Sequence, residues 1–85
     1  MGELAKLPNI GSVVEEQLRQ VGITTLKQLE ETGAQEAWLK IQAIDPSACT
    51  QRLQGLEGAV RGIPKKELPE EVKAELKEFY RQHKL

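Results

Sequence analysis

The stretch Leu7-Pro8-Asn9-Ile10-Gly11-Ser12 decides the fold, because it predicts a tight turn that leads directly into a helix. Val14, Leu18 and Val21 follow at the spacing that places apolar side chains on one face of a helix. Gly22-Ile23 then closes the segment. Residues 7–23 are therefore predicted to form one half of a helix-hairpin-helix unit.

The start of this helix is also the candidate binding site. Gly11 is expected to adopt a backbone conformation that side chains disfavour. Ser12 and Glu15 are expected to form a capping box, in which each side chain accepts from the backbone N–H of the other residue. The remaining N–H groups and the helix dipole favour an anion. The sequence thus predicts a candidate phosphate-contacting hairpin at Asn9, Ile10, Gly11 and Ser12.

Charge argues against strong nucleic-acid binding at that hairpin. Glu15 and Glu16 follow the loop directly, while Lys6 and Arg19 are the cations near it in the sequence. The chain has 12 Lys and Arg against 13 Asp and Glu, a formal net charge of -1. Nucleic-acid binding draws most of its strength from cations that neutralise phosphates. We therefore expect at most weak contact with DNA.

Helical start and stop signals continue along the rest of the chain, and no segment has a convincing strand pattern. Thr25 and Gln28 predict a second capping box, and Gly33 ends that short helix. A third helix is expected over residues 34–44, and Asp45-Pro46 is expected to start a fourth, because Asp caps helices and Pro fits their first turn. Residues 41–46 form a degenerate second hairpin that lacks the glycine a phosphate needs, which indicates a structural role.

The fourth helix is expected to end at Gly62 and the last to begin at Leu68-Pro69. Glu70 and Glu71 then lie at its positive end, and Arg81 and Lys84 at its negative end. The connections span only a few residues, so neighbouring helices must pack directly on one another. The prediction is an all-α fold, a compact bundle of about five short helices of helix-hairpin-helix or SAM-like type, in a single domain over residues 1–85.

The apolar side chains at helical spacing predict the core. Cys49 is expected to pack with Leu53, Leu56 and Val60 on one face of the fourth helix. Trp38 is expected to anchor the core, although a half-exposed Trp would serve as a partner hot spot. The side chains predicted to be largely buried are Trp38, Ile41, Leu53, Leu56, Leu76 and Phe79.

Small residues in the fourth helix predict a close contact. Gly55 and Gly58 each cost about 1 kcal/mol relative to Ala in a helix, so a compensating contact is expected. Ala48, Gly55 and Ala59 are predicted to form a close helix-contact face. Another helix of the same domain or a second copy of the chain could occupy that face, which leaves both a monomer and a homodimer open.

Little in the sequence predicts catalysis. His83 lies two residues from the end, Ser12 and Ser47 are predicted at helix starts, and a single Cys excludes an internal disulfide. Metal binding needs more His and Cys ligands than one of each. Arg61, Lys65 and Lys66 meet Glu67 almost at once, which indicates a solvated turn more than a phosphate or acidic-partner patch. We expect a cytoplasmic non-enzyme without cofactor, metal or membrane contact.

Several blocks of the sequence, in their order and spacing, resemble the C-terminal domain of the TfoX/Sxy family of bacterial competence regulators. These blocks are Leu7-Pro8-Asn9-Ile10-Gly11, Val21-Gly22-Ile23-Thr24-Thr25-Leu26, Gly33-Ala34, Ala37-Trp38-Leu39, Asp45-Pro46-Ser47-Ala48-Cys49, Leu56-Glu57-Gly58-Ala59 and Leu68-Pro69 with Leu76-Lys77-Glu78-Phe79-Tyr80. The resemblance covers nearly the whole chain. It implies a small all-helical, helix-hairpin-helix-like module in proteins that promote the expression of DNA-uptake genes. Larger members carry it behind a separate N-terminal domain, whereas this chain is expected to be free-standing.

Three hypotheses follow. The first is a protein-interaction module that assists transcriptional regulation, with a transcription-related protein as partner. The second is a helix-hairpin-helix nucleic-acid-binding domain that contacts phosphates through the Gly11 loop without reading bases. The third is a domain with no ligand beyond its own dimer. Near-neutral charge and mostly polar helix faces favour the first.

Overall fold

Helices make up every regular element that the structure describes. The computed structural model describes residues 3–84, and this part contains no strand. The all-α prediction is therefore confirmed. In chain order the elements are η1 (Glu3–Lys6), α1 (Ser12–Gln20), α2 (Leu26–Thr32), α3 (Ala34–Ile44), α4 (Thr50–Arg61), η2 (Lys65–Glu67) and α5 (Glu70–His83).

Three of the predicted helix boundaries are confirmed together with their physical causes. The Thr25 hydroxyl accepts from the Gln28 N–H at 3.1 Å, and the Gln28 side chain in turn accepts from the Thr24 N–H at 2.7 Å, one residue before the expected donor. Gly33 ends α2 with φ +84°, and Gly62 ends α4 in the left-handed region with φ +75°. Only glycine adopts these conformations without steric cost, so these stop signals could be read directly from the sequence.

The predicted start of the fourth helix was wrong. Residues 45–49, here called the Asp45 turn, precede α4, which begins at Thr50. Asp45 instead ends α3, and its Oδ1 accepts from the Ser47 N–H at 3.0 Å and the Ser47 hydroxyl at 2.6 Å. An Asp side chain that bonds two residues ahead holds a turn rather than a helix. Ser47 therefore lies within this turn and not at a helix start.

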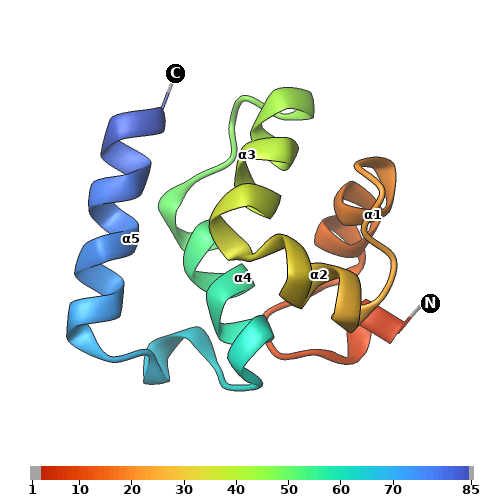
Figure 1. Cartoon of the computed structure of the whole chain (residues 1–85), viewed down its shortest axis with the longest axis horizontal. Helices are drawn as coiled ribbons and strands as arrows, with labels where there is room; N and C mark the ends of the chain where they lie inside the picture. The colour runs from red at the N-terminus through yellow and green to blue at the C-terminus, as the bar shows by residue number, and fades with distance from the viewer. Residues whose placement is uncertain (1–2, 85) are drawn as a thin grey trace.

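The helices pack in a short arc around α3 and α4 (Figure 1). In this view α5 stands on one flank of the central pair, while α1 and α2 lie on the other. The extents are 31 × 27 × 20 Å. Within residues 3–84, no helix combines the length and the apolar character that crossing a bilayer requires.

Trp38 lies at the centre of the core and is fully buried. Its indole Nε1–H donates to the Cys49 carbonyl at 3.1 Å, so burial leaves its polar atom satisfied. Phe79 and Tyr80 of α5 meet the indole edge-on, with ring centroids 6.0 and 5.7 Å away. These contacts fasten α5 to the central pair of helices.

Most of the predicted core is confirmed. The predicted side chains that are buried are Trp38, Ile41, Leu53, Leu56 and Leu76, whereas Phe79 is only partly buried. Cys49 was wrongly placed in the core, since its side chain is exposed. The reason is the later start of α4: Cys49 is the residue before the helix, so the helical spacing that linked it to Leu53 and Leu56 does not apply.

Candidate functional site

The loop before α1, residues 7–11, turns on Asn9 rather than on Gly11. Asn9 has φ +69°, and within residues 3–84 it is the one non-glycine residue with positive φ. Gly11 has φ -96° and ψ -176°, an extended conformation open to any residue. The expectation of a special backbone at Gly11 was therefore wrong. Asn is among the few side chains that enter the left-handed region readily, because its short amide bonds nearby groups.

The Asn9 side chain binds a distant part of the same chain. Its Nδ2 donates to the Gly55 carbonyl at 3.3 Å and to the Ile63 carbonyl at 3.1 Å. Its Oδ1 accepts from the Lys65 N–H at 3.1 Å. A carboxamide carries two donor hydrogens and an acceptor oxygen, so one Asn can satisfy all three backbone groups. The Asn9 side chain thus joins the loop to α4 and to the segment after it.

Two glycines of α4 make room for Asn9. A Cβ at Gly58 would lie 2.5 Å from Asn9 Nδ2 and 2.7 Å from the Ile63 carbonyl oxygen. A Cβ at Gly55 would lie 3.3 Å from Asn9 Cβ. The close approach expected at Gly55 exists, but its partner is the loop and not another helix.

Of the three residues predicted to form one close helix-contact face, Gly55 and Ala59 lie one turn apart on α4, whereas Ala48 does not share their helix. Ala48 lies in the Asp45 turn, outside α4. Both alanines and Gly55 are nevertheless buried within this chain. Contact of these residues with a second molecule stays a prediction.

The capping box predicted for α1 is absent from the described structure. Gly11 occupies the cap position without a side-chain hydrogen bond, and Ser12 is the first residue of the helix. Glu15 Oε2 instead accepts from the Ala5 N–H at 3.1 Å. The N–H groups in the first turn of a helix lack partners within it, which makes Ala5 in η1 an attractive donor for this carboxylate. Glu15 therefore ties α1 to η1.

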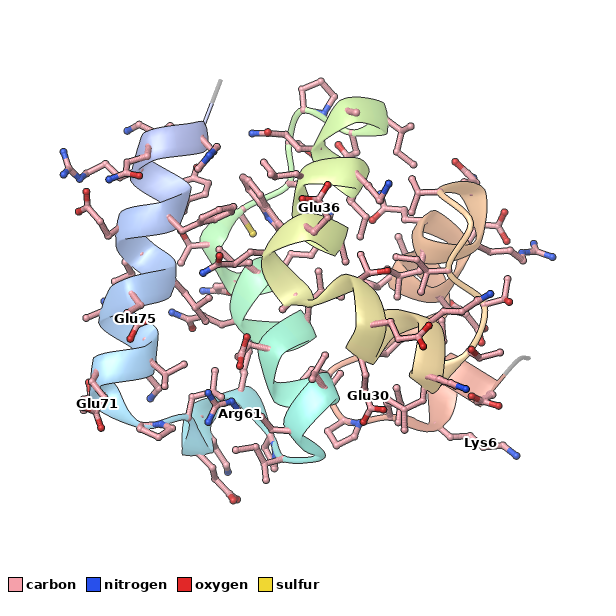
Figure 2. All side chains as sticks on the ribbon, viewed as in Figure 1. Lys6, Glu30, Glu36, Arg61, Glu71 and Glu75 are labelled. Carbon is pink, nitrogen blue, oxygen red and sulfur yellow. The ribbon has the colours of Figure 1, made fainter. Side chains whose placement is uncertain are left out.

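Acidic residues line one side of the loop. A hollow with a volume of about 360 Å³ is bordered by Ser12, Glu15, Glu16 and Arg19, among others. Glu16 forms an ion pair with Arg19, and the hydrogen bond from that guanidinium lowers the pKa of the Glu16 carboxyl. Lys6 extends outward from the edge of the molecule (Figure 2). Phosphate contact at Asn9, Ile10, Gly11 and Ser12 stays a prediction.

Two cations lie on the other side of the loop, a position that the sequence did not predict for either Arg52 or Lys65, although Lys65 was expected in a solvated turn. Arg52 and Lys65 border a hollow of about 220 Å³ together with Asn9, Ile10 and Val14. The Lys65 N–H donates to Asn9 across a separation of 56 residues, so no local sequence pattern predicts this contact. The paired glycines in α4 were the one available signal, since they indicated a close contact without naming the partner.

The Asp45 carboxylate accepts hydrogen bonds from its own turn, from α1 and from α4. Besides Ser47, its Oδ2 accepts from Gln17 Nε2 of α1 at 2.8 Å and from Arg52 Nη1 of α4 at 2.9 Å. The hydrogen bonds from Ser47, Arg52 and Gln17, in that order of effect, hold the pKa of Asp45 well below its usual range. Part of the Arg52 charge is therefore neutralised beside the loop.

The remaining reactive side chains are not assembled into a site. His83 is exposed, stacks on Phe79 at 4.1 Å between ring centroids, and its Nδ1 lies 2.8 Å from the Phe79 carbonyl oxygen. Cys49 is the residue before α4, and its side chain is exposed. In the part of the chain that the structure describes, no three His, Cys, Asp or Glu residues lie close enough together to hold a metal ion.

The chain is similar to two solved structures over nearly its whole length. A crystal structure, in triclinic form, of an uncharacterized protein from Listeria monocytogenes is 46% identical, with a TM-score of 0.92, and the match covers 93% of this chain and 90% of that one. A tetragonal crystal structure of a protein of unknown function from Listeria monocytogenes is 45% identical, with a TM-score of 0.89, and covers 92% of this chain and 96% of that one. A comparison with curated proteins finds no match. The model of the TfoX C-terminal domain matches residues 1–80, and the chain therefore belongs to the TfoX C-terminal domain family.

Proposed function

We propose that this domain is a non-enzymatic protein-interaction module that acts in the transcriptional regulation of DNA uptake in the cytoplasm. Membership of the TfoX C-terminal domain family supports this regulatory setting. The observation that carries the choice of protein over DNA is the Asn9 side chain. Its amide bonds to Gly55, Ile63 and Lys65 instead of projecting from the loop. The loop thus works as an internal joint.

Charge around the loop supports the same choice. Glu15 and Glu16 border the hollow beside Ser12, while Asp45 neutralises part of the charge of Arg52 on the opposite side. A helix N-terminus offers an anion the equivalent of about half a positive charge. We expect the carboxylates of Glu15 and Glu16, within the next turn, to outweigh that attraction at low salt, although Arg19 pairs with Glu16.

The first test is a fluorescence-anisotropy titration of labelled duplex DNA at low and moderate salt. We expect a Kd weaker than about 10⁻⁴ M at physiological salt, at the weak end of non-specific binding. The variant Glu15→Lys/Glu16→Lys is titrated in parallel. Binding by the double variant alone would show a phosphate-competent loop that the two glutamates block. Tight, salt-sensitive binding by the unaltered chain would contradict the proposal.

The partner is sought by crosslinking in the native cell with a photoreactive residue at Val13, an exposed apolar position on α1. We expect a specific protein adduct that survives nuclease treatment. Recovery of nucleic acid alone would contradict the proposal.

Nucleic-acid binding remains the second candidate, and one observation favours it. The fold brings Arg52 and Lys65 to the hollow beside the loop, where the sequence placed no cation. If DNA is bound there, Lys65→Gln weakens binding and reduces its salt dependence, because one fewer counterion is released.

A further inference from the structure

A groove runs between the start of α4 and the end of α5, on a part of the surface that the loop does not reach. These two helices are antiparallel, so the first residues of α4 lie beside the last residues of α5 (Figure 1). The groove has a volume of about 510 Å³. Besides Thr50, the residues that line this α4–α5 groove are Gln51, Gln54, Lys77, Tyr80, Arg81 and Lys84.

Every ionisable side chain at its rim except the Tyr80 phenol is a cation. Among residues 3–84, no carboxylate lines the groove, and neither Lys77 nor Lys84 forms an ion pair. Arg81 shares its charge with Glu78, whose Oε2 lies 2.6 Å from its Nη2. The positive potential is therefore carried mainly by the two lysines, about 10 Å apart along the helix axis at 1.5 Å per residue.

The stability of α5 does not by itself explain this charge. Cations in the last turn of a helix are favoured by its dipole, which accounts for Lys84 and Arg81, but that effect fades within one turn. Lys77 lies seven residues before Lys84, beyond that range. Three of the four glutamates of α5 lie in its first half, where Figure 2 shows Glu71 and Glu75, and the fourth, Glu78, pairs with Arg81. The groove therefore borders the end of the chain's last helix that carries Lys77, Arg81 and Lys84, whereas the glutamates at 70, 71 and 75 lie away from it.

Two further features suit a bound anion. Cys49 gives the first turn of α4 no side-chain cap, so the positive end of that helix borders the groove at Thr50 and Gln51. Tyr80 is half-buried against Trp38 and supplies a firm apolar wall. A ligand that fits presents at least two negative charges together with some apolar surface.

We infer that the α4–α5 groove binds an acidic, extended segment of a protein partner, which deepens the proposed function and rests on it. An extended chain advances about 3.3 Å per residue, so carboxylates three residues apart match the two lysines. A short acidic segment is favoured over a nucleic acid because two or three cations neutralise few phosphates. A long polyanion would also meet Glu78 and the acidic first half of α5.

The test is a titration of the whole chain with fluorescein-labelled octaglutamate at low ionic strength, followed by anisotropy and by backbone amide chemical shifts. We expect shifts concentrated at Thr50, Gln51 and Tyr80. The variant Lys77→Gln/Lys84→Gln should weaken binding about five- to tenfold, given the modest energy of each exposed charge pair. The matched control Lys27→Gln/Lys40→Gln removes the same charge from exposed positions outside the groove and should change affinity less than twofold.

Equal weakening by both double variants, or shifts spread over the surface, would overturn the inference by showing general attraction to charge. Stronger binding of a labelled oligothymidylate of equal length at the same amides would overturn it in favour of nucleic acid. Crosslinking in the cell separates this inference from the proposed function. A protein adduct formed from Val13 but not from Gln54 would leave the interaction module standing and reject the groove, whereas no protein adduct from either position would reject both.

Discussion

The loop before α1 and the Asp45 turn between α3 and α4 are each held by one short polar side chain, but in opposite chemical ways. Asn9 bridges the loop before α1 to two carbonyls and one N–H, which lie 46 to 56 residues away. Asp45 accepts from Ser47, Gln17 and Arg52, at separations of 2 to 28 residues. A carboxamide both donates and accepts, whereas a carboxylate only accepts. The Asn9 loop is therefore a long-range joint insensitive to pH, and the Asp45 turn is a more local one that depends on charge.

The largest expected effect comes from breaking the Asn9 joint. Asn9→Ala removes three hydrogen bonds. It also leaves an alanine at φ +69°, a conformation that alanine adopts only with strain. We expect a loss of about 2–3 kcal/mol in the free energy of unfolding, measured by urea denaturation. Asn9→Gly removes the same hydrogen bonds but adopts positive φ without strain, so its loss of unfolding free energy should be about 1 kcal/mol smaller. Equal losses for the two variants would show that backbone strain at this position is negligible.

Filling the space beside Asn9 should have the next largest effect. Gly58→Ala puts a methyl group 2.5 Å from Asn9 Nδ2 and 2.7 Å from a backbone carbonyl oxygen. We expect a net loss of about 1–2 kcal/mol, because overpacking outweighs the gain of about 1 kcal/mol in helix propensity. Gly55→Ala is the matched control, since its Cβ meets Asn9 only at 3.3 Å. If Gly58→Ala raised the melting temperature, the close approach of the loop to α4 would be wrong.

The smallest expected effect is the pH dependence of stability, which should differ between the Asp45 turn and the Asn9 loop. Hydrogen bonds from Ser47, Arg52 and Gln17 lower the pKa of Asp45 in the folded chain. The stability that they contribute is fully present above the unfolded pKa, about 3.9, and is lost as the pH falls toward the lowered folded value. Asp45→Asn should therefore lower the melting temperature at pH 7. The difference in melting temperature between this variant and the unaltered chain should become smaller below about pH 4. The Asn9 variants should show a constant difference over the same range.

Local chemistry explains which parts of the fold could be predicted. The ends of α2 and α4 follow from Gly33 and Gly62, whose positive φ is a property of glycine itself. The buried face of α3 follows from apolar spacing around Trp38. The start of α4 was mispredicted because Asp45-Pro46 fits both a helix start and a turn. The outcome depended on Gln17 and Arg52, which reach Asp45 from other helices.

The candidate site was harder to predict than the fold. The sequence marked Asn9, Ile10, Gly11 and Ser12 as a loop of interest and Gly55 as a point of close approach. It could not show that these two features meet, because their contact spans 46 residues. The cations Arg52 and Lys65 beside the loop were missed for the same reason.

By itself, the sequence determined the helical fold, three helix ends, most of the core and the family, since each depends on residue type and on spacing within one or two turns. The tertiary structure alone decided the partners of the polar side chains. Asn9 could have faced a phosphate, Glu15 could have capped α1, and Lys77 could have lain on an isolated helix face. Because α4 packs against the loop, the Asn9 side chain joins two parts of the chain instead. Because α4 also packs against α5, Lys77 lies at the rim of a groove. Such contacts depend on distances between segments far apart in the chain, which local propensity does not encode.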